Sequence, residues 1–107
     1  MENVDSIVVI NPLEDIEKLK ALASKPRLEI LALLKNHSLN INEIADKLDF
    51  PQSTVATHIS ILEEAGLIET KSIKARKGTQ KVCFPAFQEG LLIKFPDEQK
   101  TEENFVE

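Results

Sequence analysis

Cysteine and histidine are scarce in this sequence, which contains one cysteine, Cys83, and two histidines, His37 and His58. A single cysteine cannot form a disulfide within the chain, and so few ligands exclude a closed structural zinc site. Hydrophobic runs are also short: residues 7–10 follow acidic residues and do not resemble a signal peptide. No run approaches the ~20 apolar residues that a membrane-spanning helix requires. These absences predict a soluble, cytoplasmic protein with no metal site and no membrane partner.

Catalytic groupings are missing too. The sequence contains no paired-carboxylate, Ser-His-Asp or phosphate-loop arrangement, so we predict that the protein is not an enzyme and has no cofactor. His37 and Ser38 are interpreted as the start of a loop. Cys83 falls in a predicted strand, where a small buried hydrophobe is the simplest interpretation.

The charge of the chain is acidic overall but unevenly distributed. Its 107 residues suit one domain, 42% are hydrophobic, and the net charge is −5. Five cations and no acid occupy residues 71–81, whereas residues 89–107 hold six acids and two lysines. A basic cluster on a hairpin can lie across a phosphate backbone or enter a minor groove; the alternative is a solvated turn. The candidate DNA-binding cations are Lys71, Lys74, Arg76, Lys77 and Lys81.

Four helices and a hairpin are predicted. The helices span about residues 12–23, 24–35, 40–48 and 51–65. The first has Asn11 as cap, Pro12 at its first position and Glu14 placed for a capping box. Strands at 67–73 and 80–84, joined by a turn at 74–79, form the hairpin. The fold class is therefore mainly α with a small β-hairpin, a winged helix-turn-helix domain over residues 1–96.

The two ends of the domain are less regular. Residues 6–10 are predicted as a strand, and residues 87–96 either pair with it as a strand or form a terminal helix; Gly90 and Pro96 favour the strand. Residues 97–107 are predicted to be an acidic, flexible tail.

Apolar residues spread widely around the first two helices. The first helix buries either two surfaces, one of them against a partner, or one broad surface against the core. Its residues are Leu13, Ile16, Leu19, Leu22 and Ala23. The second helix is predicted to be central and buried, with Leu28, Ile30, Leu31, Leu33 and Leu34 pointing nearly all round.

The fourth helix separates into an apolar and a polar face. Val55, Ile59 and Leu62 form the inward stripe, and His58 on its flank is interpreted as a boundary packing or hydrogen-bonding residue. The outward face offers neutral hydrogen-bonding groups to DNA bases, although a plain solvated face is the alternative. These candidates are Gln52, Ser53, Thr54, Thr57 and Ser60. Backbone amides at the start of this helix, and at Asn40 of the third helix, can hold phosphates.

Three stretches carry a family resemblance. They are LKALASKPRLEILALL (19–34), INEIADKLDFPQSTVATHISILEEAGLI (41–68) and the basic hairpin. Within them, Ser-Thr-Val-x-x-His-Ile and Leu-Glu-Glu-Ala-Gly-Leu-Ile resemble the ArsR-type winged helix-turn-helix regulators. The resemblance covers about residues 12–84. It implies a transcriptional regulator that binds operator DNA as a homodimer, with helix 51–65 in the major groove and the hairpin on adjacent backbone or minor groove.

Two departures from that family matter. Residues 39–43 lack the cysteine pair of its metal-sensing members, and residues 87–95 are too short for its usual long fifth helix. Either the dimer is built differently, or the chain is the DNA-binding part of a longer regulator. We predict a sequence-specific repressor that binds a pseudo-palindromic operator as a homodimer. The alternative is a winged-helix protein-interaction module that does not bind DNA.

Overall fold

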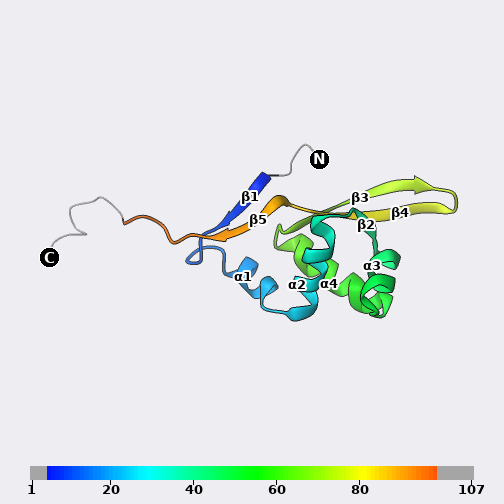
Figure 1. Cartoon of the computed structure of the whole chain (residues 1–107), viewed down its shortest axis with the longest axis horizontal. Coiled ribbons are helices and arrows are strands. Elements are labelled where there is room, and N and C mark those ends of the chain that lie inside the picture. The colour runs from blue at the N-terminus through cyan, green and yellow to red at the C-terminus, as the bar shows by residue number, and fades with distance from the viewer. Residues whose placement is uncertain (1–4, 99–107) are drawn as a thin grey trace.

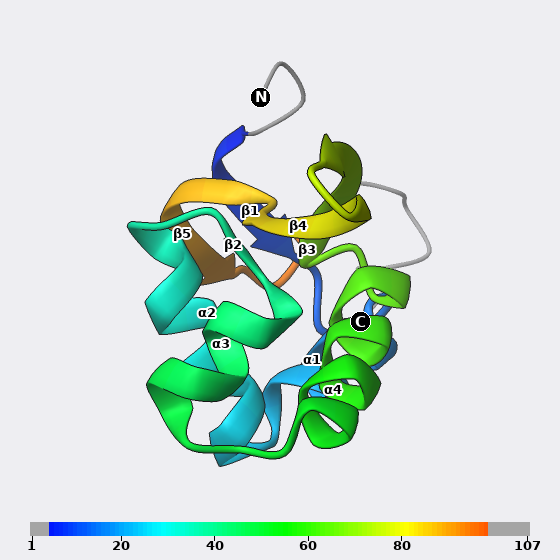
Figure 2. The same ribbon diagram turned by 90° about the vertical axis from the view of Figure 1, so that its right-hand side faces the viewer.

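The computed structural model describes residues 5–98 and arranges them as four helices beneath two small sheets (Figures 1 and 2). The elements in chain order are β1 (Asp5–Ile10), α1 (Ile16–Leu22), α2 (Lys25–Lys35), β2 (Leu39–Asn40), α3 (Ile41–Leu48), α4 (Gln52–Glu64), β3 (Ile68–Ala75), β4 (Gly78–Pro85) and β5 (Phe87–Ile93). One sheet has the order β2-β4-β3 and is antiparallel; the other is a parallel pair of β1 and β5. With five described strands, the class "mainly α with a small hairpin" is too narrow, although the winged helix-turn-helix arrangement is present.

The helix-turn-helix formed by α3 and α4 has local stop and start signals at each boundary. Asn40 and Glu43 form a reciprocal capping box at the start of α3. Asp49 ends this helix in the left-handed conformation, with φ 61°. At the end of α4, Gly66 has φ 78°, and the amides of Gly66 and Leu67 donate to the carbonyls of Glu63 and Leu62. This pair of bonds is a Schellman motif, which turns the chain directly into β3.

The first helix is shorter than predicted, because residues 11–15 form a turn. The carbonyl of Asn11 accepts from the amides of Glu14 and Asp15, and the Asn11 side chain accepts from the amide of Leu13. The Asp15 carboxylate accepts from the amide of Asn11 at 2.8 Å. These local side-chain bonds offer the backbone an alternative to the helix, so α1 begins only at Ile16.

One core joins α2, α3, α4 and the bases of the strands. Its most buried members are Ile30, Leu34, Ile44, Val55, Ile59, Leu62, Leu67, Ile68 and Cys83. Leu28 is 48% exposed, so α2 is not buried all round as predicted. Leu13 and Ile16 are also exposed, at 72% and 50%, so the apolar arc of residues 12–23 is only partly covered by the described chain.

The hairpin has longer strands and a shorter turn than predicted, and one further strand, β2, pairs with it. β3 and β4 pair from Ile68–Pro85 out to Ala75–Gly78, which leaves only Arg76 and Lys77 in the turn. We call this hairpin the wing; Figure 1 shows it extending past α3 and α4. The strand β2, which was not predicted, pairs with β4. The prediction that residues near 87–96 form a strand beside residues 7–10 is confirmed, with β5 ending at Ile93. Asp97 and Glu98 are exposed, and residues 99–107 of the predicted tail lie outside the described residues.

Candidate nucleic-acid interface

The outward face of α4 carries only neutral polar groups among the predicted contact residues. Gln52, Ser53, Thr57 and Ser60 are exposed and Thr54 is half-buried, whereas Val55, Ile59 and Leu62 are at most 1% exposed. Thr57 Oγ1 donates to the carbonyl of Ser53 at 3.1 Å, so its proton is used within the helix and its oxygen remains an acceptor. The predicted division of the helix into two faces is therefore correct. Any contact it makes with a polynucleotide uses hydrogen bonds and close approach rather than side-chain cations.

The two helix starts differ in what they offer to an anion. At α3, the amide of Asn40 donates to the Glu43 carboxylate at 2.9 Å, and the amide of Glu43 donates to Asn40 Oδ1 at 2.8 Å. At α4, the cap residue is Pro51, which makes no side-chain capping bond, and the first turn contains no acid. Because unsatisfied amides and the positive end of the helix dipole attract phosphate, α4 presents the better anion site. The Asn40 amide, one of the predicted phosphate donors, is already engaged.

The five wing cations are all exposed, but they lie on different parts of the hairpin. Side chains alternate between the two faces of a strand, and cross-strand partners share a face. Lys74 pairs with Thr79 and Lys81 with Ser72, on the face that continues to buried Cys83 at the base of the wing. Lys71 pairs with Val82, on the opposite face, and Arg76 and Lys77 form the tip. The five cations that are close together in the sequence therefore lie on two opposite faces of the hairpin and at its tip.

Side-chain bonds attach the wing to both helices of the helix-turn-helix. Asn40 Nδ2 donates to Gln80 Oε1 at 3.1 Å, across a shallow cavity of about 200 Å³ lined by residues 40–42 and 79–81. Thr70 Oγ1 donates to Glu63 Oε2 at 2.7 Å, which joins the base of β3 to the end of α4. Both views show the wing above α3 and α4 (Figures 1 and 2). These two bonds connect the wing to the start of α3 and the end of α4.

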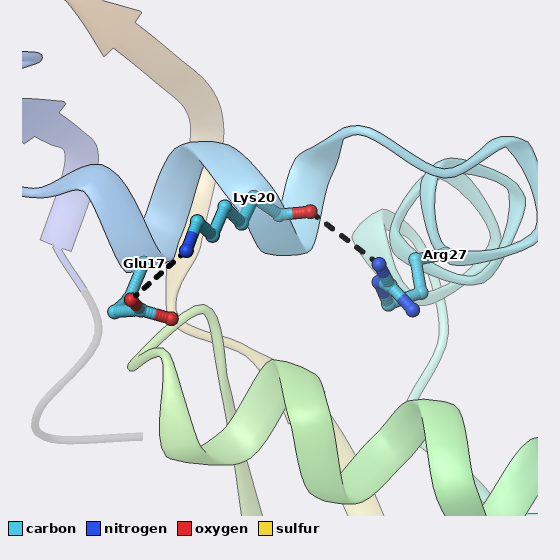
Figure 3. Close-up of polar contacts among 3 residues, drawn as sticks. All are labelled: Glu17, Lys20 and Arg27. Carbon is cyan, nitrogen blue, oxygen red and sulfur yellow. Dashed lines mark hydrogen bonds and ion pairs between the residues drawn. The ribbon is translucent and has the colours of Figure 1, made fainter.

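A bridge centred on Arg27 joins α1, α2 and α4. Its Nε donates to the carbonyl of Ala21 at 2.6 Å, and its Nη2 to the carbonyl of Lys20 at 3.4 Å. Figure 3 shows the Lys20 contact together with the exposed ion pair between Lys20 and Glu17, 3.6 Å long. Arg27 Nη1 also lies 3.2 Å from His58 Nδ1, which must then accept and leave the ring proton on Nε2.

Burial lowers the pKa of His58 from its ordinary value, and the neighbouring Arg27 charge lowers it further. The prediction that His58 is a hydrogen-bonding boundary residue is confirmed. Sequence reasoning did not find a role for Arg27 or Gln80. Arg27 stands within the quoted second-helix stretch, and Gln80 within the basic window, but only the fold brings their partners to them.

Cys83 is fully buried, as predicted, and burial raises its pKa to about 11, with Lys81 lowering and Glu63 raising it by smaller amounts. Within residues 5–98, no group of three or more histidine, cysteine or acidic side chains is placed to hold a metal ion. No helix in the same part of the chain is long and apolar enough to cross a membrane.

Comparison with known proteins identifies similar regulators. The model of the family "Bacterial regulatory protein, arsR family" matches residues 24–70. Transcriptional activator HlyU of Vibrio cholerae is 33% identical over 74 residues, covering 69% of this chain and 64% of HlyU. The uncharacterized HTH-type transcriptional regulator YbzH of Bacillus subtilis is 34% identical over 76 residues, covering 57% of this chain and 76% of YbzH. The chain thus spans just under two thirds of the length of HlyU.

A solved structure of a similar protein has the same type of fold. It is the homodimeric winged helix-turn-helix DNA-binding domain Mb0332 of Mycobacterium bovis, described as a possible ArsR-family transcriptional regulator. The TM-score is 0.62 at 28% identity, over 72% of this chain and 68% of that one.

Proposed function

The chain belongs to the arsR family of bacterial regulatory proteins, and from this premise we propose that it binds double-stranded DNA and regulates transcription. The observation that carries the proposal is the pairing of two unlike surfaces. The exposed polar face of α4, with an uncapped start and no charged residue in its first turn, stands beside a wing that carries exposed cations and is attached to α4 by the Thr70–Glu63 hydrogen bond. Neither surface alone would bind a specific site, since α4 lacks cations and the wing lacks a rigid reading element.

In the proposed complex, α4 and the wing contact different parts of the DNA. In this mode α4 enters the major groove with its N-terminal turn first, and the amides there contact a phosphate. Gln52 reads a base edge, adenine being the base to which its amide can bond twice. Ser53, Thr57 and Ser60 contribute short hydrogen bonds, with Thr54 at the margin. Wing cations contact adjacent phosphates or the minor groove.

We further propose that the protein is a repressor that binds a pseudo-palindromic operator as a homodimer. Two copies related by a two-fold axis place their α4 helices in successive major grooves, about 34–36 Å apart on one face of the duplex. Occupying a promoter in this way blocks other proteins sterically. HlyU is named an activator, so repression needs its own test. A reporter gene is placed behind a selected binding site. If the protein is a repressor, expression of the reporter falls when the protein is present.

Salt dependence of duplex binding tests the proposal. The log–log slope of affinity against salt should fall by up to ~0.9 for each phosphate contact removed. Replacing Lys74, Arg76 and Lys77 with glutamine together should therefore flatten it by up to ~2.7. Lys35→Gln is the control, because it removes an exposed cation from the end of α2, outside the wing, and should change the slope little.

Selection of bound sites from a random duplex library tests specificity. We expect two half-sites with two-fold symmetry, and Gln52→Ala should relax the preference at one position per half-site at a cost of about 1–3 kcal/mol. An unchanged salt slope in the triple variant would remove the wing from the mechanism. Failure of the wild-type protein to bind any duplex at low salt would instead favour the protein-interaction module.

A further inference from the structure

The parallel pair of β1 and β5 has one face packed on the core and one face uncovered. Ile10 is fully buried, and Val8 and Leu91 pack against the core cluster. On the other face, Ile7 and Val9 are 47% and 53% exposed. Parallel sheets are almost always covered on both faces, and a two-stranded sheet has little stability of its own. The outer face of this pair is therefore the kind of surface that proteins cover.

Register places four uncharged residues together on that outer face. Ile7 is opposite Gly90, and Val9 is opposite Leu92, which is 46% exposed. We call these four residues the strand-pair face. Of the ten exposed large hydrophobic side chains in the described residues, seven fall within residues 7–16 and 92–95, which are parts of the two strands and the segments that directly follow them. Two of the seven are Ile7 and Val9, and the others are Leu13, Ile16, Leu92, Ile93 and Phe95.

Gly90 directly follows the irregularity in the register of β1 and β5, where Asp5 pairs with Phe87 but Ile7 pairs with Gly90. It does not have a positive φ, and a Cβ built on it would meet no atom within 4 Å. A glycine within a strand costs about 0.5–1 kcal/mol relative to alanine, so its presence needs a reason. A strand glycine commonly marks the close approach of another backbone or side chain. The bulge accounts for the glycine within the chain, and the open space over Gly90 also leaves room for a side chain of another molecule.

We propose that the strand-pair face is the contact surface for a second copy of this chain. The proposal rests on the proposed function, which requires two recognition helices. An interface with two-fold symmetry brings a surface against its own copy, so charges of one sign would face each other, and the strand-pair face carries none. The cations that would attract a nucleic acid lie on the wing, at the far end of the molecule from β1 and β5 (Figure 1).

The strand-pair face is too small to form a stable interface by itself. Each partner of a stable interface buries roughly 800 Å², more than four side chains supply. The contact therefore extends to the apolar residues at the C-terminal ends of the two strands. The amide of Lys94 donates to the carbonyl of Ile10 at 2.9 Å, which continues the pairing of the two segments by one residue beyond β5. This arrangement uses strands where the family resemblance leads one to expect a long fifth helix, and it leaves both wings at the outer ends of the dimer.

Sedimentation velocity of the full chain over a range of concentrations tests the proposal. Wild-type protein should dimerise at micromolar concentration. Leu92→Gln and Gly90→Val should each weaken the dimer by about 10-fold to 100-fold, since each change occurs twice in the symmetric contact. Leu28→Gln is the matched control, because Leu28 has nearly the same exposure, 48% against 46%, on α2. The valine variant has open space in the monomer, so its circular dichroism should stay at the wild-type value.

The outcomes separate this inference from the proposed function. A monomeric wild-type protein, or glycine and leucine variants that dimerise as wild type does, would overturn the inference. Dimers that depend on Leu92 and Gly90 but bind no duplex would uphold it while refuting the proposed function. Variants that become monomeric and retain weak, salt-sensitive duplex binding would support both.

Discussion

Replacing Arg27 with alanine should lower the free energy of unfolding by about 2 kcal/mol. Arg27 makes three contacts, of which the bond to the Ala21 carbonyl at 2.6 Å is short and the other two are 3.2 and 3.4 Å long. A hydrogen bond from a charged group contributes about 1.5–3 kcal/mol when well formed. The short bond is counted at the low end of that range because Arg27 is only partly buried, and the longer two at a few tenths each. Both acceptor carbonyls lie in the last turn of α1, where a cation is favoured, although the Lys20 carbonyl also accepts from the amide of Ala23.

Urea denaturation measures this loss, and two variants show its origin. Arg27→Lys keeps the charge but cannot reach two carbonyls and a ring nitrogen with one planar group, so it should recover less than half of the loss. Lys25→Ala removes an exposed cation from the first turn of the same helix and should change the stability by less than about 0.5 kcal/mol. If Arg27→Lys is as stable as wild type, the contribution is charge alone and the bridge described above is unimportant.

The contact between Arg27 and His58 predicts how the stability of the protein changes with pH. The pKa of His58 is lowered in the folded protein, first by burial and then by Arg27, so folding favours the neutral ring. The resulting stabilisation is complete above the ordinary value of 6.5 and decreases as pH falls below 6.5 through the folded pKa. In Arg27→Ala the pKa of His58 should move upward, which NMR titration of its ring protons detects. A pKa that stays unchanged or falls in that variant would refute the assignment of Arg27 as a cause.

Three further results are expected. Asn40→Ala should cost about 1–2 kcal/mol by urea denaturation, and Asn40→Asp should recover most of it by restoring the cap but not the bond to Gln80. Asp49→Gly should be neutral or stabilising and Asp49→Val destabilising by about 1–2 kcal/mol, because φ is 61° there; equal midpoints would argue against the left-handed cap. Because the pKa of Cys83 is about 11, alkylation of the native protein at pH 8 should be at least about 100-fold slower than in denaturant. Rapid native labelling would mean that the base of the wing opens.

Elements whose boundaries are set by neighbouring residues were predicted well from the sequence. The interval from Asn40 to Glu43 specifies a capping box, and Pro51 and Gly66 delimit α4 from either side. The 3.6-residue period then assigned Val55 to the core and Ser53 to the surface. These predictions succeeded because each depends on bonds within four or five residues.

Features that depend on distant partners were not predictable. The bond between Arg27 and His58 spans 31 residues, and the one between Asn40 and Gln80 spans 40. The two-residue strand β2 has no periodicity of its own and exists because β4 offers it an edge. The same limit explains the error at residues 12–15, where a helix start and a turn closed by Asn11 and Asp15 use the same residue types.

The distribution of charge along α4 determines how an acidic protein can approach DNA in the proposed mode. The first turn of α4 contains no acid and its amides are uncapped, whereas Glu63 and Glu64 stand at its last turn. The helix dipole adds partial positive charge at the first end and partial negative charge at the other. Phosphates therefore attract the start of the helix and repel its end. Thr70 holds Glu63 against the base of the wing, which keeps that carboxylate beside the hairpin instead of extending toward the duplex. The helix is consequently favoured to enter the groove by its N-terminus, tilted so that Ser53 and Gln52 come closest to the bases while Glu64 stays away from the backbone.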